Sequence, residues 1–273
     1  MRLVTLAICI PAILAGQSAR DVLRRSMETD RTSSEAVRNY TYIERQEETE
    51  LDGSGKIKSR DAHTYDVTLQ EGSPYRRLMA HNDQPLPPKE QKKEEEKLRK
   101  SIEDRSKETA GQKQRRIDDW HRKQEKQREP VREVPDAFDL RLLGEEALAG
   151  RPVYVIDGMP RAGYKARSKV AASILPKLKV KFWVDKRDYQ CVRAEFETLA
   201  TIAWGGIVAR LAKGDRFSFE LARVNDEVWL PKHVSLTGSA RILLVKAFHG
   251  GIDITYSDYK KFSAESRILP VGQ

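Results

Sequence analysis

The chain has 273 residues, of which 39% are hydrophobic and 33% charged, with a formal net charge of +9. This length supports one large domain or two small ones with a buried core, so no disulfide scaffold is needed for folding. Two cysteines occur, Cys9 and Cys191, and no paired Cys or His spacing suits zinc, an iron–sulfur cluster or haem. The sequence therefore predicts no metal centre and no cofactor.

The positive charge is concentrated in one segment. Residues 89–128 hold 15 Lys and Arg against 10 Asp and Glu, and this surplus supplies more than half of the net charge. Clustered basic residues favour binding to phosphates, but the rest of this chain is close to balanced. We therefore expect no nucleic-acid partner.

The first 19 residues have the pattern of an export signal. Arg2 precedes an apolar run over residues 3–15, and small or polar residues follow at 16–19, the order found in secretory signal peptides. The run is shorter than the roughly 20 residues that a membrane-spanning helix needs. A buried N-terminal helix is the alternative. Export predicts a periplasmic protein. Within that prediction, the protein is either free in the periplasm or peripheral to the outer membrane.

After the signal, the pattern predicts a helix over residues 20–38 and then a β-hairpin. Aromatic and β-branched residues alternate with charged ones over residues 40–51 and 57–69. Asp, Gly and Ser at 52–55 indicate the turn between these strands.

A third strand is predicted over residues 74–79, before three prolines within 82–88 break the pattern. We assign residues 20–88 to the N-terminal helix and first strands of the domain. Residues 89–128 predict a charged helical insertion that Gly111 divides into two helices. Two interpretations of this insertion are open: a partner-binding arm or movable lid, or a solvated helical excursion held by ion pairs between successive turns.

Strand patterns then follow closely up to residue 262, as in residues 178–185, where apolar and polar side chains alternate. Connections of about 2 to 6 residues imply antiparallel pairing, since parallel crossovers need longer segments. The fold class is α+β, mainly β: an unclosed, curved antiparallel β-barrel wrapped around one or two helices, with residues 129–265 completing the same domain. The further predicted strands cover residues 138–143, 153–156, 189–201, 216–224, 227–236, 240–248 and 251–259.

The motifs of the common enzyme classes are absent from the sequence. It has no Gly-x-Ser-x-Gly elbow, no P-loop, no dinucleotide-binding glycine motif and no His-Glu-x-x-His, and its five histidines are scattered. We therefore expect no catalytic residues and a protein that is not an enzyme. A hydrolase with paired inward-facing carboxylates is the third alternative.

A curved sheet with more apolar surface than two short helices can cover would leave an apolar hollow on its inner side. An acyl chain buried there gains about 0.8 kcal/mol per methylene without any polar contact. The alternative is that helix side chains fill the hollow. The residues proposed to line it are Phe182, Val184, Phe196, Phe217, Phe219, Leu221 and Trp229.

Residues 199–211 form a mostly apolar connection with two glycines, Gly205 and Gly206, at the tip of a predicted hairpin. Trp204 and Ile207 would stand at the mouth of the cavity or contact a membrane, because exposed apolar tips with Trp favour interfaces. Packing of the same residues under a helix is the alternative.

Several strand motifs resemble a known superfamily. They are residues 138–146 (FDLRLLGEE), 150–156 (GRPVYVI), 181–186 (KFWVDK), 192–195 (VRAE), 225–232 (NDEVWLPK) and 252–259 (IDITYSDY). Together they resemble the LolA/LolB-like periplasmic lipoprotein carriers, a superfamily that includes outer-membrane lipoprotein-sorting proteins, over residues 20–80 and 130–262. The resemblance implies an unclosed antiparallel barrel around helices, an apolar cavity that receives acyl chains, and no catalysis.

These observations predict an exported, non-enzymatic binder or carrier of lipid or lipoprotein acyl chains, with a role in transport and outer-membrane biogenesis. Transient contact with a membrane or a membrane protein accompanies that function. The alternative is an envelope regulatory module that docks a partner protein through residues 89–128. The chain departs from the carriers in this segment and in the apolar hairpin over residues 199–211.

Overall fold

The computed structural model describes residues 18–36, 39–204, 209–242 and 246–261. Eleven strands follow one another in a single antiparallel sheet, in the order β4-β3-β2-β1-β13-β12-β11-β8-β7-β6-β5, while β10 pairs with β12 and β9 with β10. The strands are β1 (Tyr40–Leu51), β2 (Ile57–Gln70), β3 (Ser73–His81), β4 (Gln84–Pro85), β5 (Phe138–Leu148), β6 (Arg151–Pro160), β7 (Leu178–Asp185), β8 (Cys191–Thr198), β9 (Ile202–Trp204), β10 (Ala209–Leu211), β11 (Arg216–Val224), β12 (Val228–Ile242) and β13 (Lys246–Lys261). The helices are α1 (Ala19–Ala36), α2 (Pro88–Ser106), α3 (Ala110–Arg132), α4 (Val134–Ala137), α5 (Lys169–Ile174) and the 3₁₀ turn η2 (Leu175–Lys177).

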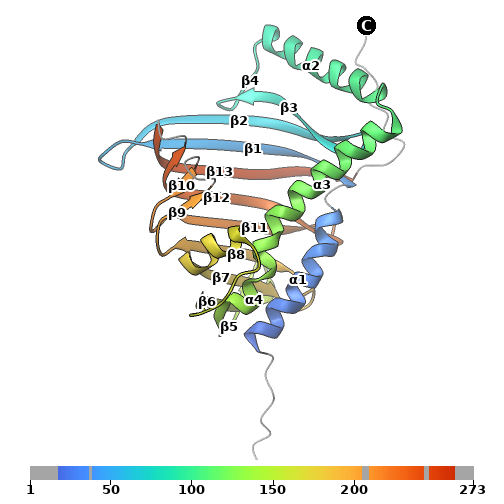
Figure 1. Ribbon diagram of the computed structural model, residues 1–273. Helices are drawn as coiled ribbons and strands as arrows, with labels where there is room; N and C mark the ends of the chain where they lie inside the picture. The colour runs from blue at the N-terminus through green and yellow to red at the C-terminus, as the bar shows by residue number, and fades with distance from the viewer. Residues whose placement is uncertain (1–17, 37–38, 205–208, 243–245, 262–273) are drawn as a thin grey trace, which may run out of the picture.

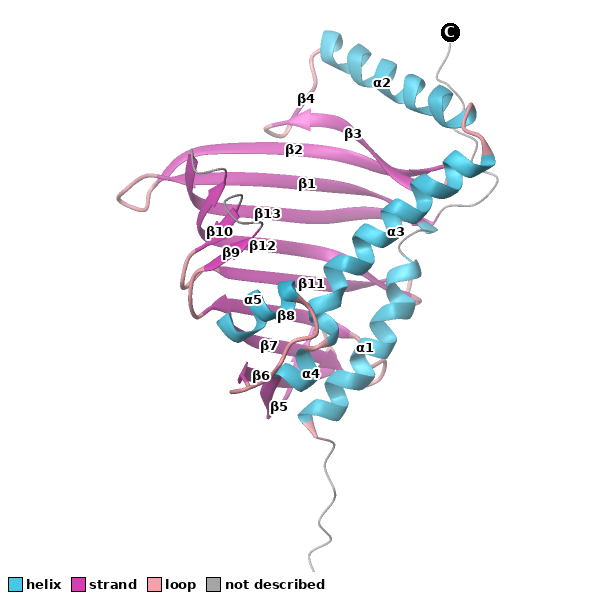
Figure 2. Cartoon of the chain, in the orientation of Figure 1, coloured by secondary structure: helices cyan, strands magenta, loops and turns pink. Residues whose placement is uncertain are grey.

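The helices α1, α3, α4 and α5 lie in front of one face of the sheet (Figures 1 and 2). We call this the inner face and define it by Ile156, Phe182 and Phe219, whose side chains belong to the core that α1 covers. Helix α3 crosses the inner face diagonally, from β3 down to α4, and α2 lies beyond the β3–β4 edge (Figure 1). The predicted fold class, an open curved antiparallel sheet around helices, is confirmed.

The β1–β2 hairpin shows how local residues set its turn. The Asp52 carboxylate accepts hydrogen bonds from the backbone amides of Ser54 (2.8 Å) and Lys56 (3.0 Å). Gly55 has a φ of 82°, a conformation that glycine adopts without steric cost. Hydrogen bonds from the Ser54 hydroxyl and from these amides hold the pKa of Asp52 below its ordinary value. The turn therefore forms where the sequence predicts it.

The main core lies between α1, α4 and the inner face of β5 to β8. Val22 and Leu23 of α1 are 0% and 2% exposed, and Phe138 at the start of β5 is fully buried beside them. On the sheet, Ile156 stands opposite Phe182. Each such side chain stabilises the fold by roughly 1.5 to 3 kcal/mol through its removal from water, so this end of the molecule is its most firmly packed part.

A second cluster occupies the outer face of the same strands. Val155 and Trp183 stand opposite each other in β6 and β7 and are buried together with Val153 and Val192. Trp229 of β12 packs against this cluster from the side. The sheet is therefore apolar on both faces at this end.

The last three predicted strands are in fact two. β12 continues through Gly238 to Ile242, and β13 begins at Lys246, so the predicted strand 240–248 is divided between them. Gly238 and Gly250 pair inside the β12–β13 ladder. A Cβ on Gly250 would lie 1.7 Å from the Thr49 carbonyl oxygen. Glycine thus permits a close approach of two strands at this point.

In the charged segment, α2 and α3 are separated by a break at Thr109 rather than at Gly111. The Thr109 hydroxyl accepts a hydrogen bond from the Gln112 amide, and the Gln112 side chain accepts one from the Thr109 amide, which together form a capping box. Gly111 lies inside the first turn of α3. The capping residue, and not the glycine, determines where the second helix starts.

Candidate ligand-binding cleft

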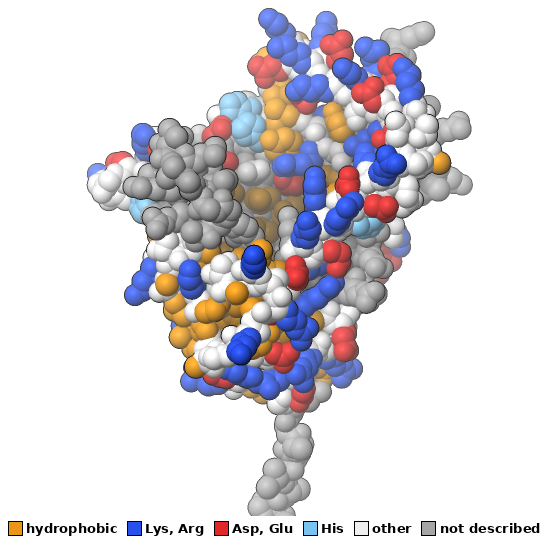
Figure 3. Space-filling model, in the orientation of Figure 1, with side chains coloured by type: hydrophobic (Ala, Val, Ile, Leu, Met, Phe, Trp, Pro, Cys, Tyr) orange, Lys and Arg blue, Asp and Glu red, His pale blue; other side chains and the backbone are white. Residues whose placement is uncertain are grey.

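An apolar cleft of about 410 Å³ lies on the inner face, between the ends of α3 and α5 and strands β7 to β12. Figure 3 shows apolar side chains gathered on this face near α5. The cleft is lined by Pro130, Val131, Val134, Ile174, Leu175, Leu178, Phe196, Thr198, Ile202, Leu211, Asp215, Arg216, Phe217 and Leu236.

The floor of the cleft is a row of side chains that runs across three neighbouring strands. Phe196 of β8 stands opposite Phe217 of β11, which in turn stands opposite Leu236 of β12. The rings of Phe196 and Phe217 are 5.7 Å apart between centroids. Directly opposite residues of antiparallel strands share a face, so strand register alone brings these three side chains together.

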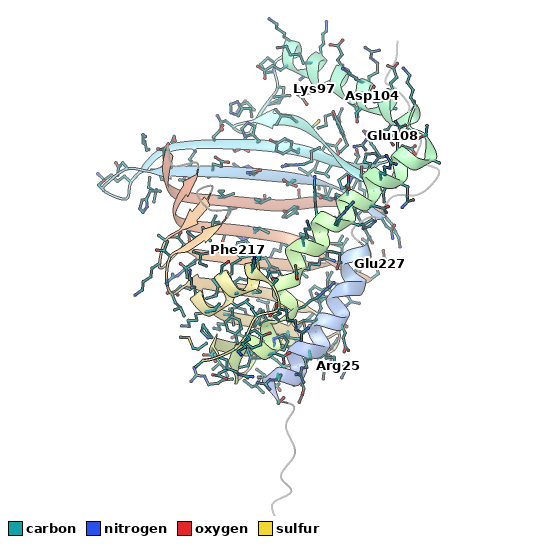
Figure 4. The ribbon with its side chains drawn as sticks, viewed as in Figure 1. Arg25, Lys97, Asp104, Glu108, Phe217 and Glu227 are labelled. Atoms are coloured by element: carbon teal, nitrogen blue, oxygen red, sulfur yellow. The ribbon has the colours of Figure 1, made fainter. Side chains whose placement is uncertain are left out.

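The wall of the cleft comes from the end of the charged helical segment. Val131 in the last turn of α3 and Val134 in α4 face the sheet across the cleft. Val131 is 45% exposed and Phe217, labelled in Figure 4, is 38% exposed. Apolar side chains of this size left open to water on both sides of a cleft are typical of a binding surface.

Polar groups at the cleft are few, and one of them organises a strand end. The buried carboxylate of Asp215 accepts a hydrogen bond from the Ala212 amide (2.8 Å). A Cβ on Gly238 would lie 2.0 Å from the same carboxylate, so only glycine leaves room for it. Arg216 stands at the rim, 3.7 Å from Glu197 between charged atoms and largely exposed. Among the described side chains, Asp215 is the charged group inside the cleft.

Two of the seven residues predicted to line the cavity, Phe196 and Phe217, do line this cleft. Phe182 and Val184 are buried in the core next to it, and Phe219 packs against that core. The ring of Phe182 meets that of Phe196 edge to face at 5.9 Å between centroids. Their contact with a ligand stays a prediction.

Trp229 and Leu221 do not lie with the other five. Trp229 packs against the buried cluster on the outer face of β6 to β8. Its indole Nε1 donates a hydrogen bond to Asp188 (2.9 Å). The placement of Trp229 in the cavity is therefore wrong.

The register between β11 and β12 shifts between Glu220 and Leu221. The extra residue, Lys232, belongs to β12, so the irregularity changes the alternation along β12 and not the one along β11 on which the prediction for Leu221 depends. Leu221 is half-buried, outside both the lining of the cleft and the cluster that packs on α1.

The predicted apolar hairpin is present as β9 and β10, in which Trp204 pairs with Ala209. Ile202 and Leu211 at its base line the cleft. The side chain of Trp204 and the whole of Ile207 lie outside the described part of the chain, so their contact with a membrane or the cavity mouth stays a prediction.

A second hollow of about 360 Å³ lies between α3 and the β1–β2 end of the inner face, with Trp120 and Arg128 on its helical side. Tyr42 and Tyr256 meet there at 5.8 Å between ring centroids. Burial, with a contribution from the nearby Glu44 carboxylate, raises the pKa of Tyr42 to about 12 and raises that of Tyr256 as well. This hollow is more polar than the cleft and suits an apolar chain less well.

The sequence patterns did not indicate a cluster formed by Asp61, His63 and His81, whose ligating atoms lie within 4.8 Å of one another. The predicted third strand ends at residue 79, two residues before His81. Two further pairs of the β2–β3 ladder, the second of them His63 with His81, bring the histidines together.

Among the residues that the structure describes, no helix is both long enough and apolar enough to cross a membrane. No family model and no curated protein matches the sequence. Solved structures that are similar include an outer-membrane lipoprotein-sorting protein domain from Vibrio parahaemolyticus, with 12% identity, a TM-score of 0.37, and coverage of 89% of this chain and 94% of that one.

A second similar structure is a LolA superfamily protein from Nitrosomonas europaea, with 11% identity, a TM-score of 0.32, and coverage of 93% of this chain and 96% of that one. A third is the lipoprotein LppX from Mycobacterium tuberculosis, with 10% identity, a TM-score of 0.32, and coverage of 88% of this chain and 94% of that one.

Proposed function

We propose that the protein is an exported, non-enzymatic binder or carrier of acyl chains, held in the apolar cleft between the helices and the inner face. The observation that carries this proposal is the cleft itself. It has a volume of about 410 Å³, and Phe217 in its floor and Val131 in its wall are both open to water. Its volume falls within the range of roughly 300 to 1,000 Å³ found for small-molecule sites.

The chemistry of the lining favours a hydrocarbon over a polar ligand. A polar ligand in the cleft would lose hydrogen bonds to water that the mostly aliphatic and aromatic walls cannot replace. A hydrocarbon tail would cover Phe217 and Val131, and each buried methylene contributes about 0.8 kcal/mol. Arg216 at the rim suits an anionic headgroup, as in a fatty acid or a phospholipid.

The export signal predicted over residues 1–19 supports a periplasmic location, where lipids and lipoproteins move between the two membranes. Residues 1–17 lie outside the described part of the chain. A role in lipoprotein transport and outer-membrane biogenesis, with transient contact with a membrane or a membrane protein, is the finer form of this proposal.

The test combines identification of the ligand with a substitution in the cleft. Mass spectrometry of lipids that co-purify with the protein should find acyl lipids, and Phe217→Asp should remove them and abolish binding of a fluorescent fatty acid. Ile102→Asp is the matched control, because Ile102 is also an exposed apolar residue (43%) but belongs to α2. Equal binding by the two variants would contradict the proposal. Phe219→Asp tests the cleft less directly than Phe217→Asp does, because Phe219 packs on the core.

One observation favours the second candidate, a regulatory module that docks a partner through residues 89–128. Helix α2 has no buried residue, and it lies beyond the edge of the sheet (Figure 1). Charge reversal of Lys92, Lys93 and Lys100 should disrupt a partner complex while fatty-acid binding is kept. If the variant keeps both the partner complex, measured by co-purification, and fatty-acid binding, measured with the fluorescent probe, docking through this helix is contradicted.

A further inference from the structure

Three potential metal ligands converge on adjacent strands at the β3 edge of the sheet. Asp61 and His63 are two residues apart in β2, so they point to the same face. His81, the last residue of β3, stands directly opposite His63. Histidine side chains are visible on this face near β3 and β4 in Figure 3.

The geometry of the cluster suits one ion between the three side chains. His81 Nε2 lies 2.6 Å from Asp61 Oδ1, and His63 Nδ1 lies 3.9 Å from Asp61 Oδ2. The two imidazole rings are nearly parallel, at 22° and 4.8 Å between centroids. Both rings therefore direct a nitrogen toward the same carboxylate, within the 4.8 Å that joins all the ligating atoms.

The backbone holds these ligands in place. Ala62, which separates Asp61 from His63, donates its amide hydrogen bond to Asn82 Oδ1 (2.8 Å), and its carbonyl accepts one from the Asn82 amide (2.7 Å). Asn82 directly follows His81, so a single residue ties the two strands together at the cluster. Ligands fixed in this way lose little conformational freedom when an ion binds.

We propose that Asp61, His63 and His81 bind a divalent late first-row transition-metal ion, with zinc as the reference. Two imidazoles and one carboxylate suit Zn²⁺ or Cu²⁺, whereas Ca²⁺ and Mg²⁺ require mainly oxygen ligands. Three protein ligands leave at least one coordination position for water or another ligand. The side chains of His63, His81 and Asp61 are 34%, 50% and 54% exposed, so an ion reaches them from solution.

The cluster belongs to the inner face of the sheet. A continuous row of opposed residues connects it with the core, because directly opposite side chains share a face. This row runs through His81, His63, Gln46, Ile254, Val234 and Phe219. The open coordination position is therefore on the side of the sheet that carries the cleft, but the metal site does not depend on the proposed acyl binding.

The competing explanation is an ordinary hydrogen bond between a histidine and a carboxylate. The chain offers a matched control for it: His233 Nε2 lies 2.6 Å from Asp253 Oδ2, the same distance as in the cluster, but no third ligand completes a group there among the described residues. A His–Asp pair alone would make His233 and His81 equivalent in metal binding.

The experiment is a zinc titration of the protein purified without a polyhistidine tag, followed by calorimetry and by competition with a chromophoric chelator. We expect one zinc ion per chain in the unmodified protein and in His233→Asn. His63→Asn and His81→Asn should each weaken zinc binding by at least about tenfold. Loss of a residue that only supports a metal ligand already weakens binding by about tenfold or more, and these two residues are the ligands themselves. Cobalt(II) should give a d–d absorption band that both variants lose.

Circular dichroism should show that each variant is folded, because the substituted side chains are partly exposed. The proposal is overturned if the protein binds no zinc at millimolar concentration, if His63→Asn and His233→Asn bind it equally well, or if magnesium and calcium compete with it at similar concentrations.

Discussion

Gly250 of β13 packs tightly against β1, since a Cβ there would lie 1.7 Å from the Thr49 carbonyl oxygen. Gly250→Ala should lower the free energy of unfolding by at least about 1 to 3 kcal/mol, because the two strands must move apart to accept the methyl group. Urea unfolding measures this change. Gly53→Ala is the control, since nothing lies within 4 Å of its added Cβ, and it should stay within about 0.5 kcal/mol of the unmodified protein. Equal losses would contradict the role given to Gly250.

The buried tyrosines make stability depend on pH in the alkaline range. Burial, more than the neighbouring Glu44 carboxylate, raises the pKa of Tyr42 to about 12, and it raises the pKa of Tyr256 and Tyr259 too. Above pH of about 10 the unfolded chain loses these protons while the folded protein keeps them. The folded state then binds more protons, so its stability falls as the pH rises.

Urea unfolding between about pH 8 and pH 11 should show this decline, and Tyr42→Phe should make it shallower because one of the groups that titrates no longer exists. A decline of unchanged slope in Tyr42→Phe would mean that other groups cause it.

At the scale of elements, Thr109 decides where α3 begins. Its capping box satisfies two amides at the start of a helix that reaches from β3 to the cleft. Thr109→Ala should destabilise the protein by about 1 kcal/mol and speed hydrogen exchange in the first turn of α3, whereas Thr109→Ser should retain most of the cap. Unchanged exchange in Thr109→Ala would show that α3 is held by its contacts with the sheet alone.

Those contacts are substantial. Arg116 donates a hydrogen bond to the Ser73 hydroxyl (2.6 Å) and another to the Glu71 carbonyl (3.1 Å), while Ile117 lies so close to Gly72 that a Cβ there would be 2.8 Å away. Helix α3 is thus anchored on the β2–β3 turn. Helix α2 also reaches this turn, because Arg105 donates hydrogen bonds to two backbone carbonyls there, although α2 has no buried residue. Both halves of the charged segment are therefore attached to the sheet at the same turn.

Elements whose ends are set locally could be predicted from the sequence. The β1–β2 hairpin matches its prediction because Asp52 and Gly55 determine its turn through neighbours in the chain. The side on which Trp229 lies depends on the pairing of β12 with β11, and the opposition of His63 and His81 depends on how far β3 extends. Neither pairing is visible in a local pattern.

The same distinction applies to the candidate cleft. Alternation along β8 and β11 correctly placed Phe196 and Phe217 on one face. The opposite wall, formed by Val131 and Val134, comes from a segment that lies more than 50 residues before these strands in the sequence. Only the packing of the end of α3 against the sheet brings the two walls together.

At the scale of the whole molecule, the helices cover the two ends of the inner face unequally. The β5–β8 end holds the core with α1 and α4, whereas the β1–β3 end is crossed mainly by α3 (Figure 2). The cleft lies where this cover becomes incomplete, at the ends of α3 and α5. An acyl chain placed there would extend the apolar core rather than occupy a separate site.

A ligand that extends the core should show a defined dependence on its length. Each added methylene that enters the cleft contributes about 0.8 kcal/mol, so the affinity of saturated fatty acids should rise by about fourfold per carbon. The rise should stop once the chain fills the volume of about 410 Å³, because further carbons remain in water. Competition of a chain-length series against a fluorescent fatty acid measures both the slope and the plateau. A series without any slope in the unmodified protein would contradict occupancy of the cleft by a hydrocarbon tail.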